Sequence, residues 1–344
     1  MTRNKRFENA LKNIPQQIPP IWFMRQAGRY HSHYQGLRKK YSFEQLCKNH
    51  ELASQVACGP IDEFDYDVAI LFSDILFPLE SMGLKLKYAP GPIFDSYFNE
   101  NSITKIKPID QIIDDLSFQR KALIETRSRL PEDKSLVGFV GGPWTLLSYG
   151  LGIKNDLEKL NLNNSHFFEK LLYDVIIPVT VKTIEMQLES EAEIVYIFDT
   201  NARQLKTDYF LNKYFKKLKE QIFNIYPKKI AYFSKDNPLL NDVSVIQNNN
   251  LAGLVYGKSE GLEVYLKSNQ KGFLQGNFEP SLLEKPFNEF KQGFDKFIDR
   301  FSKLSAEERS GWICSLNHGV LPKSSEYNVK YFIDSARESF SVSK

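Results

Sequence analysis

The pattern of apolar and polar positions divides the chain into short strand-like runs separated by longer helical stretches. Each run is rich in β-branched and aromatic residues and is followed by a polar or glycine-containing turn and then by a helical pattern. Eight such runs occur, at residues 20–23, 68–72, 136–140, 194–198, 230–233, 252–256, 272–275 and 312–316. Strands that alternate with helices predict an α/β fold, and eight such units in 344 residues predict a (β/α)8 TIM barrel, with a doubly wound sheet as the alternative.

Two intervals between the predicted strands are longer than a single crossover helix requires. The segments 24–67 and 73–135 hold extra material, including helical patterns near 43–64 and a hairpin over 84–95 whose turn is Ala89-Pro90-Gly91-Pro92. A short helical pattern also precedes the first strand. Because no linker rich in Ser and Gly divides the chain, we expect one catalytic barrel domain over residues 1–344, with extra N-terminal helices and these two insertions.

The composition is that of a soluble globular protein, with 42% hydrophobic and 25% charged residues. No uncharged apolar run reaches about 18 residues, so we expect no membrane-spanning helix. The three cysteines have no CxxC spacing, which argues against a disulfide framework and a zinc site and favours a reducing compartment. The N-terminal residues lack the apolar stretch of a secretory signal, and we therefore expect a cytoplasmic protein.

The positive charge is concentrated near the N-terminus. The net charge of +3 is too small to predict a nucleic-acid-binding protein, but residues 1–40 hold nine basic side chains against one acidic one. Five of the twelve arginines lie within the first 38 positions. Because arginine suits bidentate binding of carboxylate and phosphate groups, this segment predicts a polyanionic ligand.

Catalytic groups of a barrel enzyme lie just after the strands, so the polar residues at these positions are candidate site residues. Arg25 and Arg29 follow the first predicted strand, and they would share one face if that segment is helical. Gly28 beside them allows a close backbone approach, and Arg38 adds a third guanidinium. An anion-binding role and a solvated basic helix face both fit this pattern.

Asp74 follows the second predicted strand and lies between two apolar triplets. A carboxylate in such surroundings is unfavourable unless a cation or hydrogen-bond donors meet it. Asp74 is therefore either the N-cap of the next helix or a buried carboxylate that receives N–H donors from a ligand.

Tyr149 and His318 follow the third and the last predicted strands, and each could equally be a structural residue of the core. The glycines near 141 do not form a phosphate-binding loop, and no HExxH or GxSxG motif occurs. The sequence therefore does not support a nucleotide site, a zinc site or a nucleophilic triad.

Longer motifs resemble a known family. Residues 20–30 (PIWFMRQAGRY) resemble the N-terminal signature of the uroporphyrinogen decarboxylase family, and residues 138–145 (GFVGGPWT) resemble its second signature. The agreement continues in family order at 42–49, 71–76, 198–200, 274–277 and 318–322, and it covers residues 7–337.

The resemblance implies a TIM barrel that acts as a homodimer without cofactor or metal. It implies stepwise loss of CO2 from the four acetate side chains of uroporphyrinogen III, which gives coproporphyrinogen III in haem and porphyrin biosynthesis. It places Asp74, Arg25, Tyr149 and His318 in catalysis. The substrate-binding residues that it implies are Arg25, Gln26, Ala27, Gly28, Arg29, Arg38, Asp74, Tyr149, Phe198, Thr200 and His318.

Chemically, the electrons left by decarboxylation can enter the pyrrole ring once it is protonated, and the Asp74 carboxylate would stabilise the cation. The residues do not identify the proton donor. Arg25 is almost always charged and gives up a proton reluctantly, whereas Tyr149 and His318 have chemistry better suited to proton transfer.

The chain departs from the family pattern at several positions. His31-Ser32-His33 replaces the usual Leu-Pro-Glu, Asn201-Ala202-Arg203 follows Thr200, and Glu279 stands where Asp is usual. The predicted strand at 252–256 also lacks the usual Asp-Trp ending. Two alternative functions compete with this one: a corrinoid-dependent methyltransferase, for which no His and Cys zinc ligands are evident, and a tetrapyrrole carrier, for which Asp74 would be unnecessary.

Overall fold

The computed structural model describes residues 2–89, 91–153, 165–235, 250–268 and 271–341. Within these residues, seven parallel strands form one curled sheet, in the order β1-β4-β5-β6-β7-β8-β9. Their bounds are Val68–Ile70 (β1), Ser135–Gly141 (β4), Val195–Phe198 (β5), Ile230–Phe233 (β6), Gly253–Val255 (β7), Phe273–Phe278 (β8) and Trp312–Leu316 (β9). The TIM-barrel class is confirmed, and these seven strands lie at seven of the eight predicted positions.

The predicted strand at 20–23 is wrong as a strand, although the segment lies where the eighth strand belongs. Ile21 forms an isolated parallel bridge with Cys314 of β9, and its carbonyl accepts the Asp67 amide, 3.0 Å away, just before β1. The backbone N–H of Ile21 donates to Oδ2 of Asp67 at 2.7 Å instead of to a carbonyl. Pro20 has no N–H to donate, so a regular ladder cannot form here.

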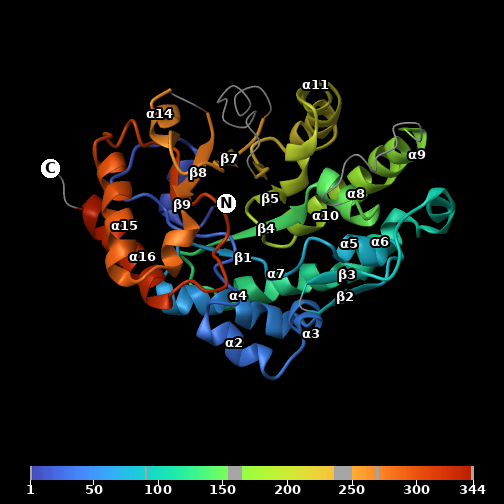
Figure 1. The fold of residues 1–344 in the computed structure, drawn as a ribbon, viewed down its shortest axis with the longest axis horizontal. Helices are drawn as coiled ribbons and strands as arrows, with labels where there is room; N and C mark the ends of the chain where they lie inside the picture. Colours follow the sequence, from blue (N-terminus) through green and yellow to red (C-terminus); the bar gives the residue numbers. More distant parts are fainter. Residues whose placement is uncertain (1, 90, 154–164, 236–249, 269–270, 342–344) are drawn as a thin grey trace.

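Helices surround the strands (Figure 1). Those before β4 include two adjacent helices in the region of the predicted helical pattern 43–64. Their bounds are Lys5–Leu11 (α1), Ser32–Arg38 (α2), Phe43–Lys48 (α3), His50–Phe64 (α4), Phe77–Ser81 (α5), Ile109–Asp115 (α6) and Ser117–Arg129 (α7), with a 3-10 turn at Glu100–Lys105. Side-chain caps begin three of them. Asn4 accepts the Phe7 amide in α1, Ser42 and Gln45 form a capping box on α3, and Asn49 accepts the Leu52 amide in α4.

The second half of the chain continues the alternation of strands and helices. Its helices are Pro143–Gly150 (α8), Ser165–Glu169 (α9), Ile177–Leu188 (α10), Thr207–Tyr209 (α11), Lys216–Leu218 (α12), Leu262–Leu266 (α14), Phe287–Ser302 (α15) and Glu326–Ser341 (α16). Turns of π-helix at Lys170–Ile176, Phe210–Phe215 and Lys219–Phe223 continue α9 and α11, and 3-10 turns lie at Thr200–Gln204 and Pro280–Glu284.

Aromatic rings dominate the contacts between the last helices and the sheet. Phe290, Phe294, Phe297 and Phe301 recur at helical spacing along the buried face of α15. Phe301 stacks on Trp312 of β9 with ring centroids 4.1 Å apart and an interplanar angle of 4°. The apolar face of α15 thus covers the end of the sheet that meets the segment 20–23.

The predicted hairpin is present as β2 (Leu86–Tyr88) paired antiparallel with β3 (Pro92–Phe94). Pro90 of its turn lies outside the described residues. In the part of the chain that the structure describes, no helix combines the length and the apolar character needed to span a membrane.

Candidate active site

The turn after the bridge at Ile21 holds Arg25 and Arg29, and it is not helical, so the condition under which they would share one helix face is not met. Residues 24–30 form turns, and Arg25 has a left-handed backbone with φ of 61°. The buried Gln26 side chain explains the turn: its Nε2 donates to the Val68 carbonyl at 3.0 Å, and the Tyr30 hydroxyl donates to the Gln26 carbonyl at 2.8 Å. These side-chain hydrogen bonds compete with helix formation and tie the turn to β1.

The loop after β9 lies against the side chain of Arg25. A Cβ added at Gly319 would lie 2.6 Å from Cδ of Arg25, so a glycine is needed for this approach. The Val320 amide also donates to the Met24 carbonyl at 2.9 Å. The two ends of the sheet are therefore joined where Arg25 projects, and His318 comes from the same loop.

Arg25 interacts electrostatically with three other predicted site residues. The surrounding protein limits its hydration and lowers the pKa of its guanidinium, although part of the side chain is exposed. The like charge of Arg29 acts in the same direction, whereas Asp74 and Tyr149 act in the opposite one. Arg29, Asp74 and Tyr149 therefore lie close enough to Arg25 to influence its charge, and the four side chains form one group at the carboxyl ends of the strands.

Asp74 accepts a hydrogen bond from the Leu76 amide at 2.9 Å, which closes an Asx turn two residues long. Helix α5 begins at Phe77 with Leu76 at its N-cap, so Asp74 is not the cap of that helix. Burial raises the pKa of Asp74, while the Leu76 amide, the Tyr88 hydroxyl and the charge of Arg25 oppose this rise. The carboxylate is therefore held in surroundings that favour a cationic or N–H-donating partner.

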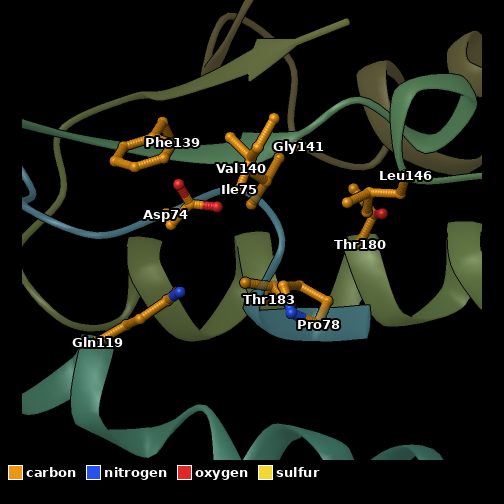
Figure 2. Close-up of a pocket in the computed structure, with 10 residues that line it drawn as sticks. All are labelled: Asp74, Ile75, Pro78, Gln119, Phe139, Val140, Gly141, Leu146, Thr180 and Thr183. Atoms are coloured by element: carbon orange, nitrogen blue, oxygen red, sulfur yellow. The ribbon is translucent and has the colours of Figure 1, made fainter. Parts of the chain in front are cut away.

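A narrow pocket lined by both apolar and polar side chains adjoins Asp74 (Figure 2). In the figure the carboxylate lies beside the ring of Phe139, and the amide of Gln119 extends toward it from α7. Gln119 donates to Oγ of Ser73 at 3.2 Å and accepts from Gln187 at 2.9 Å. The lining consists of Asp74, Ile75, Pro78, Gln119, Phe139, Val140, Gly141, Leu146, Thr180 and Thr183. This lining accounts for the poor hydration of the carboxylate.

A row of rings follows the carboxyl ends of the strands from Phe139 to His318. The ring centroids of Phe139 and Phe198 are 5.5 Å apart, those of Phe198 and Phe233 are 6.3 Å apart, and those of Phe233 and His318 are 6.0 Å apart. Phe198 and His318 are half-buried. The row provides an apolar wall for a large planar or cyclic ligand, and its two ends lie near Asp74 and Arg25.

Asp199 was not predicted as a site residue, yet it organises this end of the barrel. Its buried carboxylate accepts hydrogen bonds from the amide and hydroxyl of Thr145, at 2.9 and 2.8 Å, from Tyr232 at 2.8 Å and from Tyr214. Burial raises its pKa, and these donors oppose that rise. The motif at 198–200 marks Asp199 in the sequence, but no spacing connects it with the two tyrosines.

The remaining predicted residues lie around this group at different depths. Thr200 is half-buried and begins a 3-10 turn, and Ala27 and Gly28 are half-buried in the arginine turn. Tyr149 on α8 is half-buried beside Phe94, with ring centroids 6.5 Å apart.

Arg38 lies farther out than the other arginines. It is exposed at the end of α2 and donates to the carbonyl of Tyr41 at 2.5 Å. Its charge and that of Arg29 both act on Tyr34, so Arg38 lies at the outer edge of the group.

The positions that depart from the family pattern have defined places. Glu279 accepts from Asn317 at 2.9 Å and from Ser259 at 2.8 Å, and these donors outweigh burial, so its pKa is lowered. Arg203 is exposed, whereas the amide of Asn201 donates to Thr145.

Among the described residues, one group of three side chains has its potential metal-ligand atoms close together. His31, Glu63 and Glu326 bring their ligand atoms within 4.8 Å of one another. The three cysteines are all buried, and the described residues place none of them in such a group.

Comparisons with known proteins identify the family of the chain. The family model described as Uroporphyrinogen decarboxylase (URO-D) matches residues 2–339. Curated proteins named uroporphyrinogen decarboxylase are similar over nearly the whole chain. The protein of Campylobacter jejuni is 34% identical, and the match covers 97% of this chain and 98% of that protein. The protein of Gloeobacter violaceus is 30% identical over 97% of both chains. The protein of Aliarcobacter butzleri is 33% identical over 96% of this chain and 97% of that protein.

Solved structures share the fold. A methyltransferase from Methanosarcina mazei superposes with a TM-score of 0.74 at 18% identity, covering 99% of this chain and 100% of its own. A putative vitamin-B12 independent methionine synthase from Listeria monocytogenes gives 0.54 at 13% identity, covering 94% and 98%. With the match of the family model and the full-length relatives, the chain belongs to the uroporphyrinogen decarboxylase family of carboxy-lyases.

Proposed function

We propose that the protein removes the four acetate carboxyl groups of uroporphyrinogen III one after another as CO2, leaving methyl groups and giving coproporphyrinogen III. The observation that carries this proposal is a poorly hydrated carboxylate, Asp74, close enough to the guanidinium of Arg25 for the two charges to influence each other, with Arg29 also near Arg25 and a row of rings beside them. A macrocycle with central N–H groups and eight peripheral carboxylates matches that arrangement of charges.

Each decarboxylation can be balanced without a bound cofactor because the pyrrole serves as the electron acceptor. Protonation of the pyrrole α-carbon gives an iminium-like cation. The bond between the acetate methylene and its carboxylate then breaks, its electron pair neutralises the ring nitrogen, and CO2 leaves. Protonation of the exocyclic methylene carbon and loss of the ring proton restore the pyrrole, so one proton replaces each CO2.

Asp74 is assigned the stabilisation of this cation. Its carboxylate would accept the pyrrole N–H groups and lie close to the charge as it forms, where low hydration strengthens the interaction. This role needs the ionised form, and Arg25 and the N–H donors of the substrate favour that form against burial.

The arginines are assigned to the substrate carboxylates, with Arg25 and Arg29 inside the site and Arg38 at its edge. Gln26 acts indirectly, because its amide is used to hold the turn against β1. Ala27 and Gly28 leave room for the substrate beside these arginines. Phe198 and His318 belong to the wall of rings, and Thr200 and Tyr149 are assigned further contacts with the substrate. Arg25, Tyr149 and His318 are the candidate proton donors; the lowered pKa of Arg25 makes it a better donor than an ordinary arginine.

We also propose one catalytic domain, a homodimeric assembly and a cytoplasmic location, since the reaction belongs to porphyrin biosynthesis.

An anaerobic assay of the purified protein with uroporphyrinogen III, without added metal or cofactor, tests the proposal. Products separated after oxidation should form a ladder of seven-, six-, five- and four-carboxylate porphyrins. Tight binding without release of CO2 would instead indicate a tetrapyrrole carrier, and the Asp74→Asn variant is the matched control for turnover that depends on the site.

A further inference from the structure

Three segments far apart in the sequence meet at a histidine and two glutamates. His31 precedes α2, Glu63 lies near the end of α4, and Glu326 is the first residue of α16. Nε2 of His31 lies 2.6 Å from Oε2 of Glu63, and a carboxylate oxygen of Glu326 accepts the Ser32 amide. The candidate ligand atoms of the three residues all lie within 4.8 Å of one another.

The burial of His31 sets this group apart from a surface ion pair. Its side chain is 0% exposed, while the Glu63 side chain is 44% exposed. Among the described residues, Nδ1 of His31 has no hydrogen-bond partner, which is an unfavourable state for a buried polar atom. The neighbouring Phe64 ring lies 5.1 Å away and offers no acceptor or donor. The imidazole lies beside two carboxylates whose like charges repel each other, and a cation bound between them would offset that repulsion.

Histidine nitrogen and carboxylate oxygen are both among the atoms that bind zinc in proteins, with bonds of about 2.0–2.2 Å. Ligand atoms of a tetrahedral site with such bonds are about 3.3 Å apart. The observed separations, from 2.6 Å to at most 4.8 Å, bracket that value. Small rotations of the glutamates would convert the present contacts into coordination, and the partial exposure of Glu63 allows both this movement and a water ligand.

We propose that His31, Glu63 and Glu326 bind one zinc ion. The ion would join the start of α2 and of α16 to the end of α4. His31 also donates its amide to the Gly28 carbonyl at 3.0 Å, so the ion would brace the arginine turn from outside. Its role is structural, and the proposal does not depend on the decarboxylation mechanism.

Titration of the chelator-treated full-length protein with zinc chloride, followed by calorimetry and by elemental analysis after gel filtration, tests this site. The wild type should bind one equivalent, and zinc should raise its Tm because binding favours the folded state. Glu63→Gln should bind zinc at least about tenfold more weakly, since it removes a ligand. His166→Gln, on α9 away from α2 (Figure 1), removes an exposed histidine and should bind like the wild type.

Equal zinc affinity in the wild type and Glu63→Gln would overturn the proposal, as would the absence of a bound equivalent in the wild type. If Glu63→Gln does not fold, Glu326→Gln replaces it, because an amide oxygen can still accept the Ser32 amide. A Tm that depends on pH but not on zinc would identify the group as an ion pair and would also reject the metal site.

Discussion

One aspartate lies on each side of strand β1, and the surroundings of the two carboxylates differ. Asp67, before the strand, is completely buried and accepts hydrogen bonds from Arg6 at 3.0 Å, from the Ile21 amide at 2.7 Å and from Asn4 at 3.3 Å. Asp74, after the strand, accepts one hydrogen bond from a backbone amide and lies beside a partly exposed arginine.

The difference separates stability from function within one barrel. The amino-terminal end of the strands supplies Asp67 with its full set of protein donors, so its charge supports the fold. At the carboxyl-terminal end, burial raises the pKa of Asp74, so its ionised form lacks compensation from the protein, and in the proposed function the substrate supplies it. Asp199 lies at the same end of the strands as Asp74, but its carboxylate accepts four hydrogen bonds from the protein, and we interpret it as a structural residue. The number of protein donors, and not the end of the strand, therefore distinguishes the two aspartates.

The largest expected effect is that of Asp74→Asn on turnover. The substitution keeps the shape but removes the charge that stabilises the cation, so kcat should fall by about 10²–10³, or about 3–4 kcal/mol. Stability at neutral pH should not fall, since the raised pKa means that the ionised carboxylate is unfavourable in the folded state. Steady-state kinetics and a thermal melt check both parts, and a near-normal kcat would remove Asp74 from the mechanism.

Asp67→Ala should have the opposite effect, because it should lower the stability of the fold. Removing one partner of a buried, hydrogen-bonded ion pair leaves Arg6 and the Ile21 amide without their acceptor, and the free energy of unfolding should fall by about 3 kcal/mol. Urea denaturation measures this loss. Asp95→Ala is the control, because its pair with Lys87 is exposed and is worth about 0–1 kcal/mol. Similar losses in both variants would contradict the structural role of Asp67.

Substitutions of Arg29 and Arg6 repeat the comparison of activity with stability, with smaller expected changes. Arg29→Ala removes a charged contact to substrate, so KM should rise by about ten- to a hundredfold, equivalent to about 1.5–3 kcal/mol, with little change in Tm. Arg6→Ala should lower Tm and leave KM unchanged, because Arg6 pairs with Asp67 away from the site. If Arg29→Ala changes neither KM nor kcat, Arg29 is only a surface charge.

The smallest expected effect is a shift of a pH profile. Activity requires ionised Asp74, so kcat/KM should decrease as pH falls through the pKa of this group in the free enzyme. Because burial raises that pKa, the decrease should occur above the range of an ordinary aspartate. Asp74→Asn should lose this acid limb from its residual activity, and retention of the limb would assign it to another group.

Periodicity and composition alone predicted the alternation of strands and helices, because apolar runs of period two and helical stretches are local properties of the chain. They also marked Asp74, since a carboxylate between apolar triplets is visible in the sequence. The resemblance to a family added the remaining site residues, including Phe198 and Thr200.

Tertiary structure decided what depends on partners distant in the sequence. The segment 20–23 forms an isolated bridge and no regular strand, because the amide of Ile21 donates to the side chain of Asp67. Residues 24–30 form a turn because the Gln26 side chain donates to a carbonyl of β1. Asp199 accepts hydrogen bonds from Tyr214 and Tyr232. His31 lies beside Glu63 and Glu326, which come from two other helical segments. Side-chain hydrogen bonds and ligand groups of this kind arise only when the fold brings the partners together, so local patterns carry no signal for them.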